Sequence, residues 1–395
     1  MVPNGWSLVK LGDILTLGSG DMKPDDLQKE YSDDSPYPVY GGNNIMGYSS
    51  QKNSSDSVIL IGRVGEYCGV TRYIDKACWI TDNALYTKKV SSEIDKEYLV
   101  SKLKKFDLSR LRNKGGQPLV SQKPIYAVKL PMPPLPEQRK IAKILSTWDK
   151  AITTTERLIA TSKQQKKALM QQLLTGKKRL IDPETGEAFE GDWEEVKLGD
   201  VLTKISNGLT YDSKATQGLP VSRIETISTG KVNHAKVGYA PNDEKTIKFK
   251  LQFGDILYSH INSLEHIGRV AYFLDDKDLY HGMNLLLLRA SKDADSKFIY
   301  FMLSSSLGKE FARSHAKSAV NQASISTTDL KGFKAKLPGL GEQQKIASVL
   351  TAADKEIELL QAKLAHLKEE KKALMQQLLT GKRRVKVEEQ LEIVS

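Results

Sequence analysis

The sequence is poor in cysteine and has no long apolar run. Its two cysteines, Cys68 and Cys78, exclude a disulfide-rich fold and favour two free core thiols in a reducing cytoplasm, with a disulfide between them as the alternative. No apolar run approaches the ~20 residues of a membrane helix, and Leu285 to Leu288 predict a buried strand at most. The first ten residues contain no apolar core, so we expect no signal peptide. These absences predict a cytoplasmic protein without a membrane partner.

Signatures of catalysis are also missing. There is no G-x-x-x-x-G-K-[ST] phosphate loop and no H-E-x-x-H motif. His260 and His266 lie near Glu265 but lack a third metal ligand, so we interpret them as polar loop residues. Glu195 to Lys197 could form part of a nuclease motif, but this stretch recurs at Val9 and Lys10 and is better explained as a solvated edge. We therefore predict a non-catalytic chain with no metal site and no cofactor of its own.

The charge balance is positive. The chain has 59 Lys and Arg against 48 Asp and Glu, which gives a formal net charge of +11. Such a balance favours a polyanionic partner, although it does not determine the fold. The length of 395 residues allows two or three domains, and the apolar content of 39% is sufficient for real cores.

Two long stretches occur twice. KKALMQQLLTGK begins at Lys166 and again at Lys371, and EQRKIAKILSTWDKAI from Glu137 is matched by EQQKIASVLTAADKEI from Glu342. The offset is 205 residues. A second repeat, WSLVKLGDILT from Trp6 and WEEVKLGDVLT from Trp193, has an offset of only 187, so the second globular segment is longer by 205 − 187 = 18 residues. An internal repeat of this kind predicts two similar halves.

Each copy of the long repeat predicts one helix with a heptad seam. Helix ends are indicated by Pro136 and Glu137 at the first start and by Gly176 and Gly381 just past the two ends. From Glu137 to Leu174 the helix would be roughly 55–60 Å long. Thr155 and Ser162 weaken the first seam, and Lys166 and Lys371 occupy the same seam position, where a polar residue can fix the register. The predicted seam residues are Ile141, Leu145, Trp148, Ile152, Ile159, Leu169, Leu173, Ile346, Leu350, Ile357, Leu360, Leu364, Leu367, Leu374 and Leu378.

The seam requires a partner helix. A coiled coil between two chains is one possibility. We favour pairing of the two helices within one chain, because each supplies the same stripe. They should be antiparallel, since the second globular segment connects the end of the first helix to the start of the second.

The predicted fold class is α+β, with two globular domains in a pseudo-twofold repeat, separated by two long antiparallel coiled-coil helices. Strand, loop and strand are predicted over residues 58–74 and 253–273, and a short helix over residues 93–106 and 296–311. The tail should be disordered. We divide the chain into a first globular domain (1–136), a first helix (137–176), a linker (177–192), a second globular domain (193–341), a second helix (342–381) and a tail (382–395).

These motifs resemble a known family. KLPMPPLPEQRKIAKIL, KLPGLGEQQKIASVL, both LLTGK ends, PVYGGNNIMGY and the GRVG loop are similar to motifs of the specificity (S) subunit of Type I restriction–modification systems. The resemblance covers nearly the entire chain and implies two target recognition domains that each read one half of a bipartite double-stranded DNA target.

The resemblance also implies the partners. Two methyltransferase (M) subunits would bind S-adenosylmethionine, and restriction (R) subunits would use ATP and Mg. The Asn-Pro-Pro-aromatic tetrad of adenine methylation is absent from this chain. The alternative to a DNA-specificity subunit is a coiled-coil adaptor that joins protein partners.

DNA reading requires Arg, Lys, Asn and Gln side chains at groove edges and cations along phosphates. Arg63 is the preferred reader in the first domain, because its glycine neighbours let the backbone approach. Asn43 and Asn44 could equally serve turn formation, Arg223 could close a core salt bridge, and the matched pair Gln117 and Gln322 could belong to the scaffold. A solvated charge run is the alternative for Arg110, Arg112 and Lys114, which we otherwise expect on phosphates. The candidates are Asn43, Asn44, Tyr48, Arg63, Gln117, Arg110, Arg112 and Lys114 in the first domain, and Arg223, His260, Asn262, Ser263, Arg269 and Gln322 in the second.

Overall fold

The structure, a computed structural model, describes residues 2–113, 115–274, 277–319 and 322–387. The chain forms two compact units. Within the described residues, unit 1 comprises residues 2–156 and 362–387, and unit 2 comprises residues 157–361. Each unit therefore contains one globular domain, the start of one long helix and the end of the other.

The central sheet of unit 1 is antiparallel, with strand order β2–β8–β5–β6. All five residues of β5 are buried, because both faces of this strand are covered. Ile59 and Ile61 face the core shared with the helices, and Val58 and Leu60 face a second cluster around Tyr40, as the two-residue period of a strand requires. The strands of this sheet are β2 (Leu15–Ser19), β8 (Ala84–Val90), β5 (Val58–Gly62) and β6 (Thr71–Ile74).

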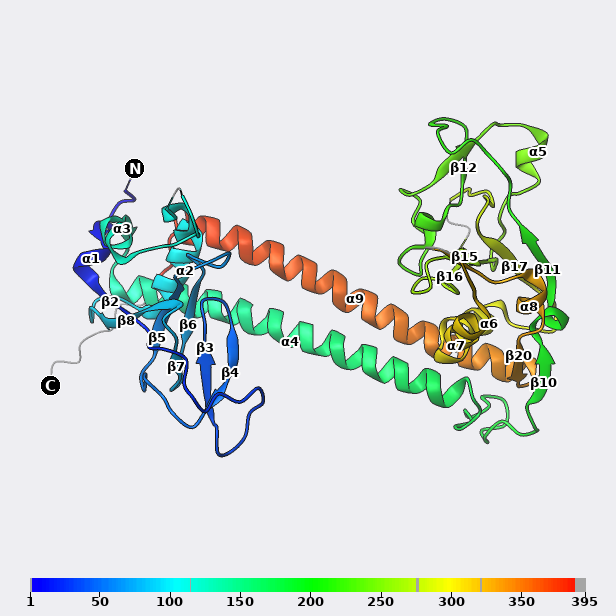
Figure 1. Ribbon diagram of the computed structural model, residues 1–395, viewed down its shortest axis with the longest axis horizontal. Helices are drawn as coiled ribbons and strands as arrows, with labels where there is room; N and C mark the ends of the chain where they lie inside the picture. The colour runs from blue at the N-terminus through cyan, green and yellow to red at the C-terminus, as the bar shows by residue number, and fades with distance from the viewer. Residues whose placement is uncertain (1, 114, 275–276, 320–321, 388–395) are drawn as a thin grey trace. The chain divides into compact units, whose positions relative to one another are not determined.

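Smaller elements complete unit 1. Helix α2 lies against β5 and β6 (Figure 1), and Asp95 caps its start by accepting a hydrogen bond from the Tyr98 amide. The pairing orders are β1–β9 and β4–β3–β7. The elements are β1 (Ser7–Lys10), α1 (Leu11–Ile14), β3 (Tyr37–Tyr40), β4 (Ile45–Ser49), β7 (Trp79–Ile80), α2 (Lys96–Phe106), the 3-10 helix η1 (Leu108–Leu111), α3 (Gln122–Ala127) and β9 (Lys129–Met132).

Unit 2 repeats this plan, with a central sheet in the order β11–β17–β14–β16. The run of leucines forms buried β17, as predicted. Other pairings are β10–β20, β12–β13 and β15–β19–β18. The strands are β10 (Glu194–Lys197), β11 (Leu202–Asn207), β12 (Leu219–Val221), β13 (Gly238–Ala240), β14 (Ile256–Tyr258), β15 (Ile261–Asn262), β16 (Val270–Tyr272), β17 (Leu286–Ala290), β18 (Lys317–Ala319), β19 (Gln322–Ser324) and β20 (Lys334–Leu337).

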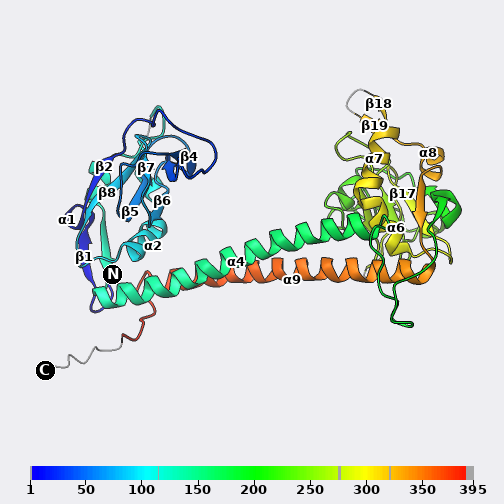
Figure 2. The same ribbon diagram turned by 90° about the horizontal axis from the view of Figure 1, so that it is seen from below.

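The helices of unit 2 differ from prediction at one point. The expected helix over residues 296–311 is two helices, α6 and α7, which lie side by side (Figure 2). Ser305 interrupts them with an extended backbone, and its hydroxyl donates to the Met302 carbonyl, a local bond that competes with helix continuation. The shorter helices are η2 (Leu198–Val201), η3 (Ile224–Ile227), α5 (Glu244–Ile247), α6 (Ser296–Ser304), α7 (Ser306–His315) and α8 (Thr327–Lys331).

The long helices are α4 (Leu135–Leu173) and α9 (Leu340–Leu378). They begin two residues before Glu137 and Glu342. At the start of α4, Pro136 lies in the first turn, where its missing N–H has no intrahelical partner to lose. Past the ends, Gly176 and Gly381 have φ of 69° and 70°, the left-handed conformation that commonly terminates a helix.

Within each unit the two long helices run antiparallel. In unit 1, Ile141 and Leu145 near the start of α4 share a core with Leu378 at the end of α9. In unit 2, Ile346 and Leu350 near the start of α9 share a core with Leu173 at the end of α4. Each seam residue named above is buried or half-buried.

Polar groups accompany this seam. Lys166 contacts Asp354 at 2.5 Å, and the equivalent pair in unit 1, Lys371 with Asp149, has the same distance. Thr155 is buried, with its hydroxyl donating to the Ala151 carbonyl 2.8 Å away. These paired charges favour one register of the two helices, because a shift would separate them.

The EQ dipeptide at each helix start is bonded into its own domain. In unit 1, Gln138 accepts from the Asp95 amide and donates to the Pro133 carbonyl. Gln343 repeats both bonds in unit 2, to Asp295 and Pro338. The side chain therefore ties the start of each long helix to the cap of a short helix in its domain, which accounts for its repetition.

The tail prediction was wrong for residues 383–385, which contact the rest of unit 1. Arg384 donates through Nε and Nη2 to Glu137 at 2.7 Å and through Nη1 to the Asn4 carbonyl. Arg179 makes the equivalent bidentate contact with Glu342 in unit 2. A buried carboxylate binds the guanidinium at both positions, so one arginine after each LLTGK is held in place. Residues 388–395 lie outside the described residues.

Cys68 and Cys78 are both buried and free, which confirms the expectation of core thiols. No helix within the described residues is long and apolar enough to span a membrane.

Candidate nucleic-acid interface

Three loops of the first domain meet at the GRVG loop. The Arg63 amide donates to the Asn83 carbonyl, and the Arg63 carbonyl accepts from the Val120 amide. The Gly65 amide donates to Pro118, which brings in the loop that contains Gln117. A Cβ on Gly62 would lie 2.6 Å from the Gly42 carbonyl oxygen, so the glycines permit the loop of Asn43 and Asn44 to approach. Regions distant in the sequence are thereby assembled into one surface.

The preferred reader, Arg63, is half-buried, and its Nη1 lies 3.2 Å from the Ser19 hydroxyl. This is a weak single bond that leaves most guanidinium donors without a protein partner among the described residues. A guanidinium with free donors can bind guanine O6 and N7. The geometry is therefore compatible with a base contact.

The neighbouring candidates differ in exposure and in how many contacts their side chains make within the domain. Asn43 accepts a hydrogen bond from Arg72 Nη2 at 2.8 Å, whereas Asn44 is exposed. Half-buried Tyr48 packs edge-on against Tyr31, with ring centroids 5.7 Å apart. Arg72 was not among the sequence candidates, because it lies within β6; the alternation of that strand could have suggested that it is accessible.

The basic loop divides into bound and free cations. Arg112 donates to the carbonyls of Glu66 and Cys68, so it holds the loop in place. Arg110 is exposed, with its guanidinium 5.8 Å from the Phe106 ring centroid. Gln117 is exposed, and Lys114 lies outside the described residues. Arg110 is accordingly the better phosphate candidate of the two arginines.

His260 lies in the interior of the second domain. It is 9% exposed, and its Nδ1 has no hydrogen-bond partner within the described residues. Burial lowers the pKa of its imidazole to about 4, so the ring is neutral at pH 7. A buried neutral imidazole cannot reach a base edge while the domain keeps this conformation. His260 is therefore the one buried residue among the contacts predicted for the second domain.

Asn262 and Gln322 lie on adjacent strands. Asn262 in β15 pairs with Ala323 in β19, next to exposed Gln322. The Asn262 amide donates to the Ser259 hydroxyl and its oxygen accepts from the Ser263 amide, which fixes the turn. Ser263 itself is exposed. The strand pairing thus joins two of the sequence-predicted segments in the second domain.

The two remaining arginines of the second domain are partly engaged. Arg269 donates to the Ser228 carbonyl and lies 2.9 Å from His266 Nδ1. Arg223 lies 3.4 Å from a carboxylate oxygen of exposed Glu225. The latter is a surface pair and not the core salt bridge considered from the sequence, so it contributes little stability and leaves Arg223 accessible.

Comparison with known proteins identifies the kind of chain. The model of the family described as "Type I restriction modification DNA specificity domain" matches residues 3–163 and 190–369. The MjaVIII type I restriction enzyme specificity subunit of Methanocaldococcus jannaschii is 29% identical over 98% of this chain and 94% of its own length. Another protein of that organism, provisionally described as the MjaX specificity subunit, is 43% identical over 50% of this chain and 47% of its own length.

Solved structures share the fold. The S subunit of a Type I system from M. genitalium is similar with a TM-score of 0.68 at 16% identity, over 96% of this chain and 99% of that one. A chain from work on complex assembly of the type I R-M system gives a TM-score of 0.54 at 19% identity, over 97% and 100%. These similarities confirm the predicted α+β fold with two repeated domains.

Proposed function

This chain belongs to the family of Type I restriction–modification DNA specificity domains, and on that premise we propose that it selects the DNA sequence for a multisubunit methyltransferase and endonuclease. In this proposal the chain has no catalytic activity of its own. Two methyltransferase subunits supply S-adenosylmethionine chemistry, and restriction subunits supply ATP- and Mg-dependent cleavage.

One observation supports the proposal above the others: a duplicated scaffold carries two different loop surfaces. The contacts that join the start of each long helix to the segment after the other long helix recur at an offset of 205 residues, as Glu137 with Arg384 and Glu342 with Arg179. The loops differ: unit 1 presents the GRVG loop and unit 2 presents β15 with the turn at Ser263. Repeated attachment with divergent loops is expected if each domain reads a different half of one target.

We extend the proposal to the division of labour. The first domain (1–136) would read one half-site and the second (193–341) the other, through polar side chains at base edges and cations at phosphates. The helices (137–176 and 342–381) would set the number of base pairs between the halves and dock the methyltransferase subunits.

The test is to map methylated adenines in cells that express this chain together with its methyltransferase subunits. We expect one bipartite motif that disappears when this chain is omitted. The purified chain alone should methylate no DNA, and adenine methylation by it would contradict a purely recognitional role. Stable complexes with other proteins, without any sequence-dependent methylation, would favour the adaptor alternative.

A further inference from the structure

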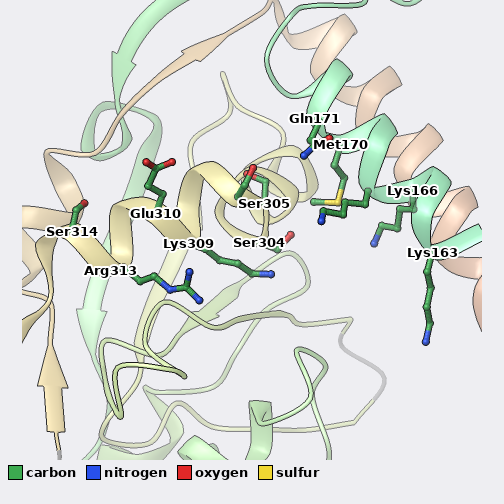
Figure 3. Close-up of a pocket in the computed structure, with 12 residues that line it drawn as sticks. Lys163, Lys166, Met170, Gln171, Ser304, Ser305, Lys309, Glu310, Arg313 and Ser314 are labelled. Atoms are coloured by element: carbon green, nitrogen blue, oxygen red, sulfur yellow. The ribbon is translucent and has the colours of Figure 1, made fainter. Parts of the chain in front are cut away.

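A groove of about 920 Å³ lies in unit 2 between the second half of α4 and helix α7 (Figure 3). Five cationic side chains line it, and Glu310 is the carboxylate among its lining residues. Three of the cations come from α4 and two from α7: Lys163, Lys166, Lys167, Lys309 and Arg313. We call it the basic groove.

The spacing along each helix explains why the cations gather there. Lys163 and Lys167 are four residues apart on α4, as are Lys309 and Arg313 on α7, so each pair lies on one helix face. Glu310 follows Lys309 directly and is rotated by about 100° around the helix axis. Figure 3 shows Lys309 and Arg313 extending in one direction and Glu310 in another.

Most of these charges are not neutralised by other described residues. Lys166 is paired with Asp354 and lies 5.1 Å from the Phe301 ring centroid. The other four cations have no ion-pair partner within the described parts of the chain. Like charges held close together repel each other, so an anion bound in the groove would relieve this repulsion.

In unit 1 the lysine equivalent to Lys163 is neutralised by an ion pair. Lys368, which corresponds to Lys163, contacts Glu156 at 2.7 Å. The residue that corresponds to Glu156 in unit 2 is Gln361, which carries no charge, so Lys163 has no ion-pair partner in the part of the chain that the structure describes. Unit 1 also has the short η1 after α2, where unit 2 has the ten-residue α7 with its two cations. At this position the lysine is therefore paired in unit 1, whereas in unit 2 it has no ion-pair partner among the described residues.

The basic groove is continuous with the candidate DNA surface. Lys309 and Arg313 also line a neighbouring cavity of about 470 Å³, whose other lining residues include one carboxylate, Glu265, together with His266 and Arg269. At the other side, Ser305 and Ser306 at the start of α7 line the groove, and the free amides of a helix start favour an anion. The cations thus form a path that leads away from the recognition loops.

We propose that the basic groove binds backbone phosphates of duplex DNA beside the half-site read by the second domain, without regard to sequence. This inference rests on the proposed function. The groove is extended and begins at the recognition loops. Its shape therefore fits a row of backbone phosphates better than a single compact anion. Such contacts position the domain on the duplex, while base contacts specify the sequence.

The test uses the assembled complex with its methyltransferase subunits and compares the wild type with Lys309→Gln/Arg313→Gln. Binding is measured between 50 and 200 mM salt, on the target duplex and on a duplex with the second half-site replaced. Over this fourfold rise in salt, each phosphate contact makes the affinity fall by a factor of about 3.5. Losing one contact therefore makes the total fall smaller by that factor. The fall should therefore be about twelvefold smaller for the double variant, on both duplexes, with an unchanged methylated motif.

The matched control is Lys345→Gln/Lys355→Gln, which removes the same charge from α9 outside the groove and should keep the wild-type salt dependence. Equal salt dependence of the wild type and the groove variant would overturn the proposal. Weakened assembly with the methyltransferase subunits, at unchanged salt dependence, would identify the groove as a protein-docking site instead. If the wild-type complex itself shows no preference between the two duplexes, the proposed function fails, which is a distinguishable result.

Discussion

The backbone of Arg63 is hydrogen-bonded on both sides, whereas most donors of its guanidinium have no hydrogen-bond partner among the described residues. Its backbone is bonded to Asn83 and Val120, while its side chain makes one hydrogen bond within the described residues, to Ser19 at 3.2 Å. Arg63→Ala should therefore leave the loop folded and weaken or relax one half of the target, by ~1–3 kcal/mol if the contact is bidentate to guanine. Mapping of methylated motifs measures this effect.

Arg110→Ala provides the contrast for Arg63→Ala. Loss of an exposed cation that binds phosphate should lower affinity for all sequences alike and leave the motif unchanged. Relaxation of both half-sites by Arg63→Ala would contradict the assignment of one domain to each half.

Two buried histidines predict a pH dependence confined to the second domain. Burial lowers the pKa of His260 and of His281 from 6.5 to about 4. Below pH 6.5 the unfolded chain binds protons that the folded domain excludes until about pH 4. The free energy of unfolding should therefore fall as pH is lowered from 6.5 to 4, by on the order of 2 kcal/mol per histidine, and then level off.

Hydrogen exchange, corrected for intrinsic rates, measures this loss locally. Protection of β14 and β17 should decrease between pH 6.5 and 4.5, and the His260→Gln/His281→Gln variant should lose less. The first 156 residues contain no histidine, so the sheet of unit 1 is an internal control over the same interval. An equal decrease in both sheets would mean that other groups cause the pH dependence.

At the scale of elements, the end of α9 depends on one ion pair. Glu137 is almost fully buried, at 4% side-chain exposure, and Arg384 is its partner. Arg384→Gln leaves that carboxylate without its cation, at a cost of about 1–3 kcal/mol. We expect faster hydrogen exchange at the end of α9 and in the first turn of α4.

The repeat supplies the control for Arg384→Gln. Arg179→Gln should loosen the equivalent helix ends in unit 2 and leave those of unit 1 protected. Adding Glu137→Gln to Arg384→Gln should recover part of the loss, because it removes the unpaired charge. If the additional change costs further stability, the pair is not coupled.

Much of the fold could be predicted from the sequence, where one local pattern decided the outcome. The apolar run of β5 and the leucines of β17 predicted buried strands because few other structures suit such runs. The break at Ser305 could not be predicted, since three serines are compatible with a weak helix until packing selects a turn. The burial of His260 depends on how β14 and β15 pack, which no short pattern encodes.

The candidate site was predictable to a lesser degree. The glycines flanking Arg63 correctly marked a place where chains approach, because a Cβ at Gly62 would collide with the Tyr67 carbonyl oxygen at 2.3 Å. The basic groove was missed, although Lys309 and Arg313 have helical spacing. Its significance required the knowledge that α7 and α4 line one groove and that Lys163, opposite neutral Gln361, has no ion-pair partner among the described residues.

At the scale of the whole molecule, each unit takes its helical support from two distant parts of the chain. Unit 1 pairs the start of α4 with the end of α9, and unit 2 pairs the end of α4 with the start of α9. The division between the units falls at Glu156 in α4 and at Gln361 in α9, positions that are also 205 residues apart. The connections between the units are therefore equivalent helical segments.

Insertions at these segments test whether the helices set the spacing between half-sites. Four residues inserted after Thr155 and after Leu360 should lengthen each helix by ~6 Å. Four residues also form a stutter, which locally unwinds a coiled coil and preserves most of the seam. Because base pairs stack ~3.4 Å apart, the unread spacer of the methylated motif should grow by one or two base pairs.

The half-site sequences should stay the same, since neither insertion moves a recognition loop relative to its own domain. Both insertions are required together. A single insertion would lengthen only one helix between the pairs Lys166 with Asp354 and Lys371 with Asp149, so both pairs could not form at once. Methylated motifs before and after insertion give the answer. An unchanged spacer in a folded, active variant would show that the helices do not measure the spacing, and altered half-site bases would show that reading and spacing are not separate.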